Sequence, residues 1–231
     1  WRYTIPANNQ LNDPGPGTPG LPGYWRNQAT YRGLDGNHSV YDLQPFNQDE
    51  IYVPDTREID AGYNNKYVIR CDTTHHMKLY ATASFPITGT PATIAIAGHP
   101  GSGGSLKIPF CTFGANTGSD YMYVAAISNT NIRVRADVTM FDYAYDWSAK
   151  EVVVAVFDGA SSRLYVSAKT AVATGTVGSL ASPDSDGIVG AFKNPFTLGD
   201  SWAGTGGTNA LKHAMLIDGA LTNAEVGNLL D

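Results

Sequence analysis

Aromatic and acidic side chains alternate in the segment Phe141-Asp-Tyr-Ala-Tyr-Asp-Trp147, which we expect to be a loop between two strands. Aromatic rings bind the apolar faces of sugars, while carboxylates, amides and backbone groups hold the sugar hydroxyls. A second indole lies in the Gly-rich segment Asp200-Ser-Trp-Ala-Gly204. The candidate ligand-binding residues are therefore Tyr143, Tyr145, Trp147 and Trp202. The alternative is that these loop aromatics pack on the body of the domain.

Carboxylates in the same two segments could contribute oxygen ligands to a calcium ion. The candidates are Asp142, Asp146 and Asp200. Calcium takes about six to eight oxygen ligands, so these three side chains would supply only part of its coordination shell. Calcium is therefore a hypothesis that depends on whether the three carboxylates converge in the fold.

A search for catalytic motifs gives one partial match. Glu58-Ile59-Asp60 resembles the start of the Glu-x-Asp-x-x-Glu strand of laminarinase-type hydrolases, in which alternate carboxylates lie on one face of the strand. Gly62 and Tyr63 occupy the positions around the expected second glutamate. A retaining mechanism needs two carboxyl groups, so we expect no catalytic activity.

Histidine and glycine clusters give no stronger signal. His75 and His76 are adjacent, and neighbouring residues on a strand point to opposite faces, so they cannot both bind one metal ion. The segment Gly98-His-Pro-Gly-Ser-Gly-Gly104 lacks the Lys-Ser/Thr ending of a phosphate-binding loop. We expect it to be a hairpin loop.

The last third of the chain carries the clearest structural motifs. Residues 151–157 and 163–167 are β-branched runs separated by Asp158-Gly159, which predicts a β-hairpin. Thr222 and Glu225 have the spacing of a helix capping box, and Leu221 and Val226 that of a hydrophobic staple. The chain therefore ends in a short helix.

This order of motifs resembles the C-terminal half of laminin-G-like, concanavalin A-like jelly-roll domains. The resemblance rests on the hairpin, on Pro195-Phe-Thr-Leu-Gly199 and on Gly219-Ala-Leu-Thr-Asn-Ala-Glu225, within residues 151–231. It implies an all-β fold of two antiparallel sheets with a short C-terminal helix, and ligand and calcium sites in loops at the rim. These motifs define a fold, so they do not by themselves assign a function.

Upstream of these motifs, the sequence predicts an extended arm followed by a single domain. Residues 12–23 contain four of the thirteen prolines, so this stretch can form neither a helix nor a central strand, and we expect residues 1–23 to be a Pro/Gly-rich extended arm. Residues 24–231 form the jelly-roll domain. The predicted strands are 67–71, 78–85, 92–97, 107–113, 121–128, 132–139, 151–157, 163–167, 187–192 and 211–217. The arm is either a linker or a contact to a neighbouring subunit of an oligomer.

Composition excludes two classes of function. A net charge of −6 without a basic cluster argues against nucleic-acid binding. No apolar run is long enough for membrane insertion. Cys71 and Cys111 fall in predicted strands and could be bridged or free, so they leave the cellular compartment open.

Two classes of function remain. The first is a non-catalytic extracellular or virion-surface module whose rim loops recognise a glycan, which predicts an exposed Trp147 or Trp202. The second is a structural virion protein, such as a capsid decoration or a tail or fibre component, that binds other protein subunits through the arm. A polysaccharide-degrading enzyme with an unfamiliar site is a third hypothesis.

Overall fold

The computed structural model describes part of the chain, in ten segments. They are residues 43–45, 59–60, 66–67, 77–79, 89–100, 106–114, 121–127, 130–180, 183–189 and 210–231. The predicted arm, residues 1–23, lies outside them, as do Cys71, His75 and His76. The assembly role of the arm therefore stays a prediction from the sequence.

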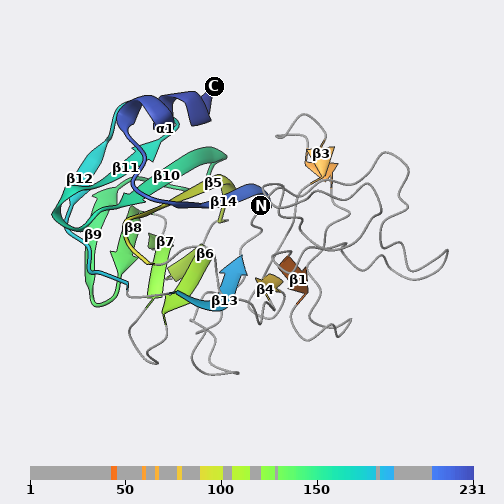
Figure 1. The fold of residues 1–231 in the computed structure, drawn as a ribbon. Helices are drawn as coiled ribbons and strands as arrows, with labels where there is room; N and C mark the ends of the chain where they lie inside the picture. Colours follow the sequence, from red (N-terminus) through yellow and green to blue (C-terminus); the bar gives the residue numbers. More distant parts are fainter. Residues whose placement is uncertain are drawn as a thin grey trace.

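Two antiparallel sheets lie face to face (Figure 1). The seven-stranded sheet has the order β1 (Leu43–Pro45), β4 (Met77–Leu79), β13 (Pro183–Val189), β6 (Leu106–Gly114), β7 (Tyr121–Ile127), β8 (Asn131–Ala136) and β9 (Thr139–Ala144). The five-stranded sheet has the order β12 (Ala173–Gly175), β11 (Ser162–Val166), β10 (Glu151–Phe157), β5 (Ala92–His99) and β14 (Ala210–Asp218). A separate pair joins β2 (Ile59–Asp60) to β3 (Lys66–Tyr67). The predicted two-sheet, all-β architecture is confirmed.

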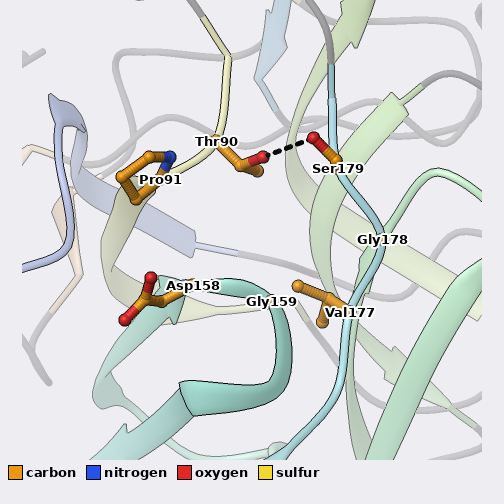
Figure 2. Close-up of a pocket in the computed structure, with 7 residues that line it drawn as sticks. All are labelled: Thr90, Pro91, Asp158, Gly159, Val177, Gly178 and Ser179. Atoms are coloured by element: carbon orange, nitrogen blue, oxygen red, sulfur yellow. Dashed lines mark hydrogen bonds between the residues drawn. The ribbon is translucent and has the colours of Figure 1, made fainter.

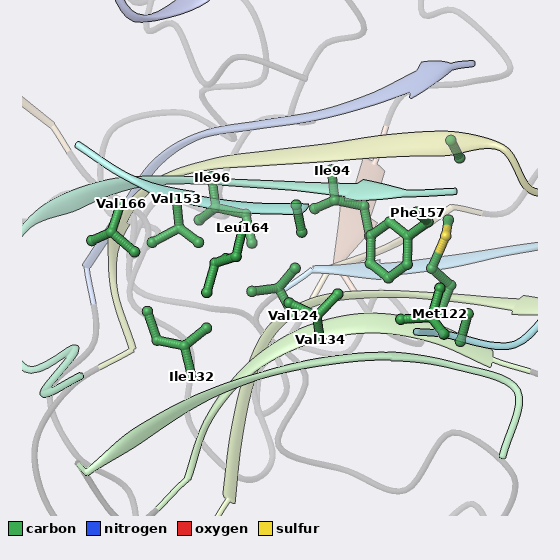
Figure 3. Close-up of a cluster of buried hydrophobic side chains, with 14 of the residues drawn as sticks. Ile94, Ile96, Met122, Val124, Ile132, Val134, Val153, Phe157, Leu164 and Val166 are labelled. Carbon is green, nitrogen blue, oxygen red and sulfur yellow. The ribbon is translucent and has the colours of Figure 1, made fainter. Parts of the chain in front are cut away.

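The core fills the space between the two sheets. Successive side chains on a strand point to opposite faces, so alternate residues of each strand reach this space. Figure 3 shows the inward-pointing side chains, among them Ile94, Ile96, Met122, Val124, Ile132, Val134, Val153, Phe157, Leu164 and Val166. All but Val166 are at most 1% exposed. Burial of this apolar surface is the main force that holds the sheets together.

Strand β10 is buried on both of its faces. Val153, Ala155 and Phe157 belong to the core between the sheets. Val154 and Val156 face the other way, into a smaller apolar cluster that includes Val226 of the terminal helix. This double burial explains why the sequence of β10 is a continuous apolar run instead of the alternating pattern of a half-exposed strand.

The terminal helix α1 (Asn223–Leu230) packs on the outer face of the five-stranded sheet (Figure 1). The predicted capping box is confirmed, because the Glu225 N–H donates to Thr222 Oγ1 at 3.3 Å and the Thr222 N–H donates to Glu225 Oε2 at 2.8 Å. The Tyr165 hydroxyl donates a hydrogen bond to Asn223 Oδ1 at 2.5 Å, and this bond joins α1 to β11. No helix in the described part of the chain is long and apolar enough to cross a membrane.

The β8–β9 hairpin differs from the sequence-based prediction. Residues 132–139 were expected to form one strand and 141–147 a loop, but the chain turns at Asp137–Val138 and Ala136 pairs with Thr139. Asp137 adopts a positive φ of 53°. Aspartate tolerates this conformation better than most residues, so the turn forms without the Asn-Gly or Asp-Gly pair that usually marks it.

Other predicted elements are adjusted by the structure. The hairpin of residues 151–157 and 163–167 is confirmed as β10 and β11, joined by a short 3-10 turn at Gly159–Ser161. The predicted hairpin at 98–104 is not borne out, because β5 and the next strand, β6, belong to different sheets and do not pair. Residues 101–104 of this segment lie outside the described residues. The short strands β1 and β12 were not predicted, since three residues carry too little periodicity.

Candidate functional site

The predicted aromatic loop is strand β9, at the edge of the seven-stranded sheet. Its side chains alternate between the two faces as a strand requires. Phe141, Tyr143 and Tyr145 are half-buried and pack against the core between the sheets. Met140 and Asp142 point outward and are exposed. Within β9, Asp142 thus lies on the opposite face from Phe141 and Tyr143 and cannot form one site with them.

Trp147 is a core residue. Its side chain is 0% exposed, and its indole Nε1–H donates to the carbonyl oxygen of Gly98 at 3.1 Å. This bond satisfies the buried indole N–H and ties the segment after β9 to the end of β5. The prediction of an exposed indole is therefore wrong at Trp147, because its ring has no free surface to offer a ligand. Trp202 lies outside the described residues.

Tyr143 and Tyr145 lie at the end of the sandwich where β9 finishes and β10 begins. Their rings are stacked, with centroids 6.2 Å apart and planes inclined by 16°. The Tyr145 hydroxyl donates to Glu151 Oε1 at 2.6 Å, and the Ser167 hydroxyl donates to Glu151 Oε2. We call Tyr143, Tyr145, Glu151 and Ser167 the rim cluster.

Backbone contacts fix the position of the rim cluster. The Val152 N–H donates to Ser167 Oγ at 3.1 Å, and the Ser167 N–H donates to the Val152 carbonyl oxygen at 2.8 Å. Ser167 adopts a positive φ of 45° at the end of β11. The start of β10 and the end of β11 therefore hold Glu151 and Ser167 beside Tyr145, which directly follows β9. The cluster offers two parallel rings beside a carboxylate.

The Tyr145–Glu151 bond predicts a pH dependence of stability. The hydrogen bond to Glu151 is the main cause that raises the pKa of Tyr145 to about 12, and burial adds to it. A tyrosine in the unfolded chain titrates at about pH 10. Between about pH 10 and 12, Tyr145 therefore keeps its proton in the folded state and has lost it in the unfolded state. This contribution to stability is complete below about pH 10 and is lost as the pH rises through about 12.

The measurement is the free energy of unfolding of the wild type and of Tyr145→Phe between about pH 9 and 12. The difference between the two proteins should shrink as the pH rises. The wild-type protein has thirteen tyrosines, so only this difference isolates Tyr145. A difference that stays constant across the range would show that the bond does not hold the proton of Tyr145.

The structure does not bring the three predicted calcium ligands together within the described residues. Both oxygens of Asp142 accept hydrogen bonds from Arg133, at 2.7 Å from Nε and 2.7 Å from Nη2. This two-point ion pair raises the pKa of Arg133. Asp146 is exposed beyond β9, and Asp200 lies outside the described residues. The described residues contain no group of three His, Cys, Asp or Glu side chains that could hold a metal ion.

Two members of the rim cluster were not among the predicted site residues. The sequence places Glu151 at the start of one predicted strand, 151–157, and Ser167 at the end of the next, 163–167. The scarcity of glutamate is the sequence feature that could have pointed to Glu151, since the only glutamates of the chain are Glu50, Glu58, Glu151 and Glu225. Asp60 lies in β2, and Glu58 lies outside the described residues, so the partial hydrolase motif stays untested.

Solved structures share this fold, although no protein-family model and no curated protein matches the chain. A structure of botulinum neurotoxin type C, whose cell entry depends on two ganglioside molecules, matches with a TM-score of 0.56 and 12% identity. The match covers 90% of this chain and 50% of that one. Domain 4 of AbnA, an extracellular GH43 arabinanase from Geobacillus stearothermophilus, in complex with arabinotriose, matches with a TM-score of 0.53 and 12% identity, over 78% of this chain and 81% of that domain. At this identity the chain shares with them a β-sandwich fold.

Proposed function

We propose that this chain is a non-catalytic, extracellular glycan-binding module and that its rim cluster contacts the sugar. The observation that carries the proposal is the pair of stacked rings beside Glu151 at an end of the sandwich. Two proteins of the same fold support it, since one is in complex with arabinotriose and the cell entry of the other depends on interaction with two ganglioside molecules.

The chemistry of the rim cluster suits a sugar. The half-buried rings of Tyr143 and Tyr145 offer apolar surface to the C–H groups of a pyranose or furanose ring. Each oxygen of Glu151 accepts one hydrogen bond within the cluster, which leaves lone pairs for sugar hydroxyls. Glycoside hydrolysis needs a second carboxyl group across the scissile bond, whereas the rim cluster contains one. The arrangement therefore supports binding without cleavage.

Titration calorimetry of the full chain with arabinotriose and with a ganglioside headgroup oligosaccharide tests the proposal. We expect Tyr143→Ala and Glu151→Gln each to weaken binding by about tenfold or more, as truncation of a central contact usually does. Met140→Ala is the matched control, because Met140 is 40% exposed on the opposite face of β9. Unchanged affinity in both rim variants would refute the role of the cluster, and release of shortened sugar by the wild type would refute the non-catalytic assignment.

A further inference from the structure

A concave surface lies at the other end of β10 from the rim cluster. Glu151 begins β10, whereas Asp158 follows its last residue. The cleft there has a volume of about 290 Å³, near the lower limit for small-molecule sites. Its lining residues are Thr90, Pro91, Asp158, Gly159, Val177, Gly178 and Ser179 (Figure 2).

Hydrogen bonds between distant parts of the chain hold the walls of this cleft. Thr90 Oγ1 lies 3.2 Å from Ser179 Oγ, and the Thr90 N–H donates to the Leu180 carbonyl oxygen at 3.1 Å. The Val177 N–H donates to the Gly159 carbonyl oxygen at 3.1 Å. The cleft is thus formed before any ligand arrives, which lowers the entropic cost of binding.

Asp158 is the one acidic side chain in the lining. Its backbone is fixed, because its N–H donates to Ser162 Oγ at 2.9 Å and its carbonyl oxygen accepts from the Ser161 N–H at 2.9 Å. Its carboxylate makes no hydrogen bond or ion pair with the described residues, and it does not cap the short turn that follows. A carboxylate with free lone pairs in the lining of a cleft is an acceptor for ligand donors.

The rest of the lining complements Asp158. Figure 2 shows the hydrogen-bonded Thr90 and Ser179 hydroxyls on the side of the cleft away from Asp158. Hydroxyls both donate and accept, as sugar hydroxyls do. Pro91 and Val177 add apolar surface to the lining. The mixture of one acceptor, two hydroxyls and apolar surface fits a neutral ring that carries several hydroxyls.

We propose that this cleft is a second binding site, for a single neutral sugar or polyol unit, with Asp158 accepting hydrogen bonds from two neighbouring ligand hydroxyls. The class of ligand rests on the proposed function, but the site shares no residue with the rim cluster. A module with both sites would contact glycan at two opposite ends of the sandwich.

Chemical shifts of backbone amides test this site in the full chain. The probes are arabinose, galactose and glycerol, with ethylammonium as a cationic comparison. We expect a sugar or glycerol to shift the amide signals of Gly159, Gly178 and Ser179, and Asp158→Asn to weaken that binding by about tenfold to a hundredfold. Asp146→Asn is the matched control, since it makes the same chemical change at an exposed position near the rim cluster.

The outcomes separate this inference from the proposed function. Cleft shifts that persist in Tyr143→Ala and disappear in Asp158→Asn support the second site. Shifts at the rim cluster without shifts at the cleft overturn the second site and leave the proposed function intact. Shifts at the cleft without binding at the rim support the second site and overturn the rim as a sugar contact. A response to ethylammonium alone, or equal binding by Asp158→Asn, overturns the assignment of a neutral ligand to Asp158.

Discussion

Replacement of Trp147 by alanine is expected to lower the free energy of unfolding by about 3–5 kcal/mol. The indole is fully buried in the core between the sheets, so its removal leaves a large cavity. The change also removes the 3.1 Å hydrogen bond that the indole N–H donates to the carbonyl oxygen of Gly98. Denaturant unfolding followed by circular dichroism measures the effect.

Two further variants separate the contributions of packing and hydrogen bonding at Trp147. Trp147→Phe keeps an aromatic ring but removes the N–H donor, so it should cost less than Trp147→Ala. Met140→Ala, at an exposed position on the same segment, should change the unfolding free energy by no more than about 0.5 kcal/mol. A loss below about 1 kcal/mol for Trp147→Ala would contradict the burial of the indole.

Replacement of Gly175 by alanine should destabilise the fold by about 1–3 kcal/mol, because it overpacks the contact between two sheet edges. A Cβ atom at this position of β12 would lie 2.3 Å from Cγ of Phe141 in β9 and 2.6 Å from its Cβ. These atoms are close to the backbone, so the ring cannot swing away at low cost. Denaturant unfolding again measures the loss.

A matched glycine and a double-mutant cycle test the cause. A Cβ at Gly227 of α1 would meet only Lys169 Cδ, at 3.8 Å, so Gly227→Ala should be neutral or stabilising. If the clash with Phe141 is the cause, Gly175→Ala combined with Phe141→Ala should cost less than the sum of the two single changes, by at least about 0.5 kcal/mol. If the two unfolding free-energy changes simply add, the clash with Phe141 is not the cause of the destabilisation.

The sequence predicted those elements whose signals are local. Thr222 and Glu225 specify the start of α1 by their own hydrogen bonds, which depend on nothing outside one turn of helix. The β10–β11 hairpin follows from two β-branched runs separated by Asp158-Gly159. In both cases a few neighbouring residues determine the geometry, so the structure confirms the prediction.

The candidate site was harder to predict because it depends on long-range contacts. Trp147 is buried in the core and bonds Gly98, 49 residues away, and no local pattern around Trp147 indicates that partner. Glu151 joins the tyrosines only because β10 and β9 meet at the same end of the sandwich. The turn at Asp137–Val138 reversed the chain without the usual glycine, so the aromatic segment was assigned to a loop.

Strand β9 also bears on how copies of this protein behave at high concentration. It ends its sheet and pairs with β8 alone among the described strands, so its other edge is a place where a second chain could add a strand. Asp142 points outward along β9, and exposed Asp146 follows it. Asp142 is already paired with Arg133 of β8, so in an edge-to-edge contact the Asp146 carboxylates of the two copies would repel each other, which opposes association. Asp146, first considered as a calcium ligand, is thus expected to have a second consequence, protection of the folded protein against aggregation.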